Sequence, residues 1–227
     1  MQPPPLSLWQ EFLFSRTISP GMYRVRSGCF LAASLVVAFS AFCVIWSLSV
    51  PIVAAARKGG YTGPKKALEI LDARFGYSME DVNQVLSAWT TLGRAWYLGI
   101  EFLDVALFIP AYSAADLVLM NCLISKLQLW RPDLPQVVRQ GLVCLPFLVA
   151  AADNWEDVGQ VALTLWFESA AVAAATGEAG LPPTGWWWGA AVAVSSCVNQ
   201  IKWWCIRVNL LLIVLLVCLW VRGVLGA

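Results

Sequence analysis

The sequence predicts an all-α integral membrane protein, a four-transmembrane-helix bundle with an amphipathic helix in its first loop. Hydrophobic residues make up 59% of the 227 positions, charged residues make up 13%, and the mean hydropathy is +0.69. These values lie outside the usual range of soluble globular domains. Apolar stretches long enough to cross a hydrocarbon core of about 30 Å recur along the chain. Residues 1–227 are therefore expected to form one membrane-embedded helical domain, with the lipid bilayer as its solvent.

The predicted spans occupy residues 29–56, 94–127, 137–166 and 186–221. The first is longer than the apolar core of a signal peptide, typically about 7–15 residues, so an uncleaved anchor is favoured over a cleaved leader. Prolines mark the connections, with Pro132 and Pro135 after the second span and Pro182 and Pro183 after the third. The last stretch is longer than one span requires, so a break near Lys202, giving five membrane segments, is an alternative.

The polar loop 57–93 is expected to contain the amphipathic helix. Ser78 followed by Asp81 is typical of a capping box, which begins a helix by satisfying its free amide groups. Apolar residues then recur at helical spacing, at Val82, Val85, Leu86 and Trp89. This helix is expected either to pack on the end of the bundle or to lie in the membrane interface as a lid.

The distribution of Lys and Arg favours cytoplasmic termini, because positively charged loops stay preferentially on that side of a membrane. The N-terminal segment 1–28 carries Arg16, Arg24 and Arg26. The second loop is flanked by Lys126, Arg131 and Arg139, and the charges of the third loop are Glu168 and Glu178. The first loop opposes this orientation, since it places Arg57, Lys58, Lys65, Lys66 and Arg74 on the outer side.

Polar residues recur inside the predicted spans and fall on single helix faces. Glu101 and Asp104 are three residues apart in the second span and share a face. The third span has a stripe at helical spacing, consisting of Asp153, Glu156, Asp157, Gln160 and Thr164. The last span adds Ser195, Asn199, Lys202 and Asn209 on a common face. An acidic residue at a helix centre costs about 2.5–3.5 kcal/mol on insertion scales, so these faces are expected to point at one another inside the bundle.

The predicted ligand- or ion-binding site consists of Glu101, Asp104, Asp153, Asn154, Glu156, Asp157, Gln160, Asn199 and Lys202. Six carboxylates lie in or near the spans, against Lys202 and Arg207 as cations deep in the last one. The excess acids are expected to be protonated, hydrated, or neutralised by a bound cation or cationic ligand. In the structural alternative, Lys202 bridges Asp153 or Glu156 and only fastens the helices. Glu101 or Asp116 would then lie near the lipid headgroups.

Several function classes are disfavoured by composition. The chain has no histidine, so haem ligation, His-based catalysis and His-based zinc sites are not expected, and no cofactor or metal is predicted. A net charge of +1 without a basic run disfavours nucleic acid as a partner. The seven cysteines lie in apolar stretches without a C-x-x-C pair, so no disulfide framework is expected. Interfacial belts account for most of the 13 tryptophans, with an aromatic amine cage as an alternative.

The leading functional hypothesis is a multi-pass membrane protein whose intramembrane acidic site binds or transports a cation, protons or a cationic, lipid-like small molecule. The first alternative is a structural or assembly subunit whose charges pair with partner membrane proteins. The second is a lipid-modifying enzyme that uses Glu156 or Asp157 as a general acid or base, although no recognisable nucleophile or metal triad accompanies them. The residues favour a non-enzymatic role and leave all three hypotheses open.

Overall fold

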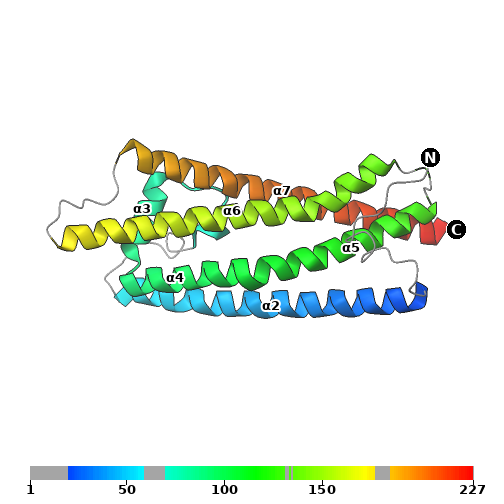
Figure 1. The fold of residues 1–227 in the computed structure, drawn as a ribbon, viewed down its shortest axis with the longest axis horizontal. Coiled ribbons are helices and arrows are strands. Elements are labelled where there is room, and N and C mark those ends of the chain that lie inside the picture. The colour runs from blue at the N-terminus through cyan, green and yellow to red at the C-terminus, as the bar shows by residue number, and fades with distance from the viewer. Residues whose placement is uncertain (1–19, 59–69, 131–132, 134, 177–184, 227) are drawn as a thin grey trace, which may run out of the picture.

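Four long helical rods lie side by side along the longest axis of the molecule (Figure 1). The computed structural model describes residues 20–58, 70–130, 133, 135–176 and 185–226. The rods are α2 (Pro20–Lys58), a composite of α4 (Thr91–Leu103), η3 (Asp104–Phe108) and α5 (Ile109–Trp130), then α6 (Gln136–Ala175) and α7 (Trp186–Gly226). Within the described residues, four helical stretches are long and apolar enough to cross a membrane. The predicted helical fold and its four membrane-length helices are thus confirmed.

The direction of the rods alternates along the chain. The start of α2 and the end of α7 lie at the same end of the bundle (Figure 1). α2 packs on α4 and α5, α6 packs on α7, and α5 also contacts α6 and α7. Because the number of rods is even and successive rods run in opposite directions, the first rod begins at the end where the last rod finishes.

Two boundaries differ from the sequence prediction. α6 continues to Ala175 rather than ending near residue 166, so Glu168 lies on a helix and not in the third loop. α7 runs without interruption through Lys202, so the alternative with a break there is wrong. The Lys202 side chain points into the bundle and is 3% exposed, and a helix has no reason to break where its polar residue is buried among partners.

The surface of the bundle is more apolar than its centre. Phe102 is 70% exposed and Trp155 is 68% exposed, whereas Glu156, Asp157 and Gln160 are completely buried. In water this distribution would be unfavourable, because large apolar patches would be hydrated and charges would be desolvated. It suits a protein whose outer surface contacts lipid and whose polar groups face one another.

The second rod contains one π-helical turn, η3, just before Pro110. The Ile109 amide donates to the carbonyl of Asp104, five residues earlier. Pro110 has no amide hydrogen and its ring crowds the preceding turn, so the local hydrogen-bond pattern changes there. The rod remains continuous, and the first residue of the wider turn, Asp104, is buried.

The first loop is folded onto the bundle. It contains the short 3-10 helix η2 (Leu71–Ala73) and the helix α3 (Met79–Ala88), which contacts α7 near the end opposite the termini (Figure 1). The predicted capping box is confirmed, because Ser78 Oγ accepts from the Asp81 amide at 3.1 Å and Asp81 Oδ2 accepts from the Ser78 amide at 2.8 Å. The Ser78 hydroxyl also donates to Asp81 Oδ2 at 2.7 Å, and this bond, together with the one from the Ser78 amide, lowers the pKa of Asp81.

The apolar stripe of α3 enters the main hydrophobic core. The side chains of Val82, Val85, Leu86 and Trp89 are completely buried. They join residues from every rod, among them Ile52 of α2 and Leu163 of α6. The predicted amphipathic helix therefore packs on the bundle, the first of the two expected arrangements.

We predict that Gly159→Ala destabilises the packing of α6 on α7. A Cβ atom at Gly159 would lie 2.6 Å from Ser195 Oγ, closer than real Cβ atoms come. Overpacking of this kind typically costs about 1–3 kcal/mol. Thermal unfolding in detergent should show a lower melting temperature, partly restored by Ser195→Ala. Gly141→Ala is the control on the same helix, because a Cβ there meets no atom within 4 Å. Equal melting temperatures for the two glycine variants would contradict the close contact.

Candidate functional site

The site is centred on the ammonium group of Lys202, which comes from the middle of α7. Its Nζ forms ion pairs with Asp72 Oδ1 and Glu156 Oε2 and lies 3.0 Å from Asp153 Oδ1. Asp72 belongs to η2 in the first loop, and the other two acids belong to α6. One cation therefore joins three segments that are distant in sequence.

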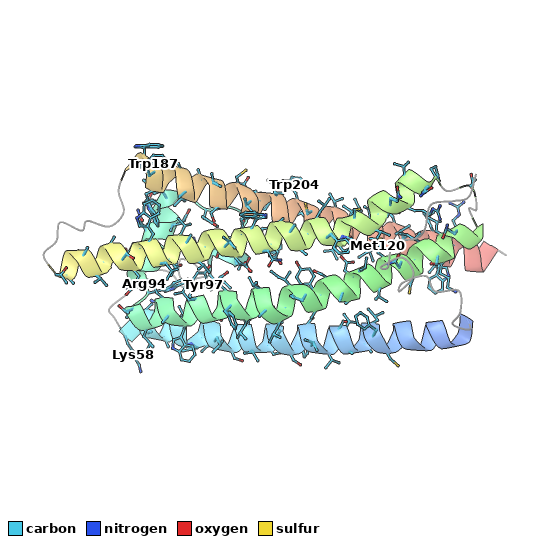
Figure 2. All side chains as sticks on the ribbon, in the orientation of Figure 1. Lys58, Arg94, Tyr97, Met120, Trp187 and Trp204 are labelled. Carbon is cyan, nitrogen blue, oxygen red and sulfur yellow. The ribbon has the colours of Figure 1, made fainter. Side chains whose placement is uncertain are left out.

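A chain of hydrogen bonds surrounds Glu156, which is completely buried. Its Oε1 accepts from Gln160 Nε2 at 2.5 Å and also from Asn199 Nδ2. Gln160 in turn accepts from the Tyr97 hydroxyl, and the Tyr97 side chain lies between α4 and α6 in Figure 2. Donors from α6 and α7 thus converge on one carboxylate, and Gln160 links α4 to it. Donors of this kind stabilise its ionised form in an apolar surrounding.

The first loop is attached to α7 by polar side chains of that helix. The Gly76 amide donates to Asn199 Oδ1 at 2.7 Å, the Tyr77 amide donates to Ser196 Oγ at 2.9 Å, and the Tyr77 hydroxyl is 2.6 Å from Ser195 Oγ. Gly76 has a φ of +76°, and a Cβ there would lie 2.7 Å from the Gln200 side chain. Burial raises the pKa of Tyr77, so its hydroxyl stays neutral. This attachment brings Asp72 to Lys202.

A second set of acidic residues has carboxylate oxygens without a hydrogen-bond partner among the described residues. The atoms without a hydrogen-bond partner include Glu101 Oε2, Asp104 Oδ1 and both carboxylate oxygens of Asp157. Glu101 is 2% exposed, Asp104 is 7% exposed and Asp157 is completely buried. The charges of Glu101 and Asp104 act on Asp157 across the interior. Unlike Asp72, Asp153 and Glu156, these three acids do not pair with Lys202, and Asp157 has no hydrogen-bond partner on either oxygen among the described residues.

The charges of the site do not balance within the described part of the chain. The acids are Asp72, Glu101, Asp104, Asp153, Glu156 and Asp157, and the cation among them is Lys202. The other buried cation, Arg94, pairs with Glu168 and donates to the carbonyls of Leu86 at 2.8 Å and Trp89 at 2.5 Å. It lies near the same end of the bundle as α3 (Figure 2). The centre therefore carries an excess of acidic groups.

A large cavity of about 1150 Å³ reaches this centre. Its polar lining includes Asp72, Asp104, Asp116, Asp153 and Lys202, and its apolar lining comes mainly from α2, α5 and α7. The residues of α2 that line it extend from Leu31 to Val53, which is about six turns of helix. Asp153 Oδ2 also accepts from the Tyr112 hydroxyl at 2.6 Å at the cavity wall. The cavity is thus long and mainly apolar, with Asp72, Asp104 and Asp153 on one part of its wall and Asp116 twelve residues further along the second rod, about 18 Å away.

The structure brings most of the predicted site residues together in the interior. Asp153, Glu156, Gln160, Asn199 and Lys202 form one bonded network. The remaining acids, Glu101, Asp104 and Asp157, are buried beside it. Asn154 does not join them: it is half-buried, and its amide donates to the Ala150 carbonyl of its own helix at 2.7 Å. The placement of Glu101 near lipid headgroups, which was one expectation, does not match its burial.

Three residues of the site are not among the predicted site residues. Asp72 lies in the polar loop 57–93, and Tyr97 and Tyr112 lie in the second span. The spacing of Tyr97, Asp104 and Tyr112 along the second rod is the signal that could have located the tyrosines, since all three reach the interior. For Asp72 the flanking Ile70 and Leu71 give a weak signal of burial.

Comparison with known proteins gives no relative. No family model matches the chain, and neither the curated proteins nor the solved structures contain a match.

We predict that Lys202→Met strongly destabilises the protein. Removing the ammonium leaves Asp153 and Glu156 without their cation, and breaking a buried pair in this way typically costs about 3–5 kcal/mol. Thermal unfolding in detergent should therefore show a much lower melting temperature, and the double variant Lys202→Met/Asp153→Asn should recover part of the loss. Lys126→Met, which removes an exposed charge, is the control. A mild effect of Lys202→Met would show that the acids are already neutral without it.

Proposed function

We propose that this chain is an integral membrane protein that binds an amphiphile with a cationic amine head group. The head group lies beside Asp104, Asp72 and Asp153 on the cavity wall, and the hydrocarbon part lies along the apolar walls. The observation that carries the proposal is the combination of a long, mainly apolar cavity with acids on its wall, of which Asp104 Oδ1 and Asp116 Oδ1 have no hydrogen-bond partner among the described residues.

The exterior supports a location in the membrane. Its four long apolar helices and exposed Phe102 and Trp155 match the requirements of a lipid-facing surface. A ligand of the cavity would then come from the bilayer. α2 makes its main contacts with α4, η3 and α5, whereas α7 makes its main contacts with α6, α5 and α3. Because α2 and α7 share few contacts in the described part of the chain, the passage between them is the route that fits such a ligand.

The charge of the site selects the head group. A phosphate or carboxylate head would meet Asp104, Asp153 and Asp72 at the cavity wall and would be repelled. A neutral head would leave the excess negative charge in place. An ammonium group donates three hydrogen bonds and carries the opposite charge, so it satisfies unpartnered oxygens such as Asp104 Oδ1.

The shape of the cavity selects the rest of the ligand. Its volume of about 1150 Å³ exceeds what a small inorganic cation or a proton would require. Much of its lining consists of Leu, Ile, Val and Phe side chains, such as Leu35, Phe42 and Leu210. Burial of a hydrocarbon chain there contributes about 0.8 kcal/mol per methylene group relative to water. The gain is smaller when the hydrocarbon chain enters from the lipid bilayer instead of from water, so selectivity between ligands depends on the head group.

We predict that hexadecylamine binds in lipid nanodiscs and that hexadecanol, with the same chain and a neutral head, binds at least about tenfold more weakly. Binding of radiolabelled ligand is measured in buffer containing EDTA, with empty nanodiscs subtracted. Asp104→Asn should weaken the binding of hexadecylamine and leave the binding of hexadecanol unchanged. Equal affinity for amine and alcohol would contradict the proposed head-group site.

The position of the hydrocarbon chain is tested with two serines of α2. Ser49 lines the cavity and Ser47 does not, and both hydroxyls bond to carbonyls of their own helix. Ser49→Trp should obstruct the cavity and reduce hexadecylamine binding, whereas Ser47→Trp should leave it unchanged. If both variants bind as the unmodified protein does, the amphiphile lies elsewhere.

A further inference from the structure

We infer that Asp72, Asp153 and Asp157 form a binding site for a divalent cation. The sequence alone leads to the expectation of no metal, because the chain has no histidine. The inference is separate from amphiphile binding, since it concerns a different class of ligand and depends on Asp157, which does not line the cavity.

The geometry of the three aspartates suits an ion. Each offers one carboxylate oxygen, and these oxygens all lie within 4.8 Å of one another. Calcium binds oxygen at about 2.3–2.6 Å and magnesium at about 2.0–2.1 Å, so ligands on opposite sides of an ion are about 4–5 Å apart. One ion can therefore contact all three residues with only small movements of the side chains.

The state of Asp157 is a second and independent observation. Its side chain is completely buried, and neither of its carboxylate oxygens has a hydrogen-bond partner among the described residues. Buried polar groups in native proteins are nearly always paired, because desolvation without a partner is costly. The unpartnered carboxylate contributes an oxygen to the group shared with Asp72 and Asp153. A cation at that position would supply the missing partner.

Lys202 does not fill this role for Asp157. Its ammonium pairs with Asp72, Asp153 and Glu156, and no ion pair with Asp157 is present in the described part of the chain. The first two of these acids have a second oxygen each, so they can bind the ammonium and an ion together. Asp153 Oδ2 already accepts from Tyr112, whose hydroxyl can rotate to release it. A dication would also reduce the excess negative charge of the centre.

The ligand set identifies the class of ion. All three ligands are hard carboxylate oxygens, and the chain has no histidine. The cysteines are exposed or half-buried and therefore lie outside this interior group. Such a set favours Mg²⁺, Ca²⁺ or Mn²⁺ over Zn²⁺ or Cu²⁺. Asp72 and Asp153 line the cavity, so water molecules that complete the coordination shell, and the ion itself, can enter from there.

The test uses the full-length protein in nanodiscs, stripped with EDTA and then transferred to metal-free buffer. Mn²⁺ is the probe, and its free concentration is followed by electron paramagnetic resonance. We expect one Mn²⁺ per chain, displaced by Ca²⁺ or Mg²⁺, and a melting temperature that rises with Mn²⁺. Asp157→Asn should weaken Mn²⁺ binding about tenfold or more, because the site loses one charged ligand. It should remove the Mn²⁺-dependent rise in melting temperature as well.

The matched control is Asp116→Asn, which changes an intramembrane carboxylate that is bonded to Asn209 and lies outside the three-aspartate group. It should leave Mn²⁺ binding unchanged. If Asp157→Asn does not fold, Asp72→Asn in the first loop serves as the second variant, with the same expected loss.

The inference is overturned if the wild-type protein takes up no Mn²⁺ at millimolar concentration, or if Asp157→Asn and Asp116→Asn affect binding equally. Because amine binding is measured in EDTA, a failure of either proposal is distinguishable from a failure of the other.

Discussion

The sharing of the Lys202 ammonium by three carboxylates is the interaction on which the rest of the structure depends. Asp72 comes from the first loop, Asp153 and Glu156 come from α6, and the lysine comes from α7. Each charge alone would be strongly disfavoured in a lipid environment, and an ion pair offsets that cost only when its remaining hydrogen bonds are also satisfied. This requirement fixes the rotation of α6 and α7 about their axes. It also explains why the loop is folded inward, since Asp72 must reach the interior.

Much of this arrangement is predictable from the polar residues that recur on single faces of the helices. The spacing from Asp153 to Gln160 and from Asn199 to Lys202 places each set on one face of its helix. A charged face is unfavourable in lipid, so the packing of α6 on α7 through these faces follows from helix geometry and solvation. The same reasoning located the capping box at Ser78 and the buried stripe ending at Trp89. Periodic patterns of this kind are local, and they survive folding because the helices themselves persist.

The position of Asp72 could not be predicted in this way. The loop is held by single contacts, such as the Gly76 amide on Asn199 and the Tyr77 amide on Ser196. Backbone amides have no sequence signature, so nothing in the residue order indicates which side chains they meet. The end of α6 was misplaced for a related reason. Glu168 interrupts the apolar run after Trp166, but a helix needs only its backbone bonds to continue, and Glu168 gains Arg94 as a partner there.

The structural and ligand-binding interpretations of the buried acids apply to different members of the group. Glu156 receives two amide donors and a lysine, and Asp153 receives a tyrosine and the same lysine, so their charges are compensated by the protein. A fastening role accounts for them fully. It does not account for Asp157, whose two oxygens meet no donor in the described part of the chain, or for the free oxygen of Asp104. A protein selected only for stability would replace such groups with apolar residues at no loss, because an unpaired buried acid contributes nothing to packing. The positively charged ligands proposed above would supply the partners that the fold does not, at the cavity wall for Asp104 and in the three-aspartate group for Asp157.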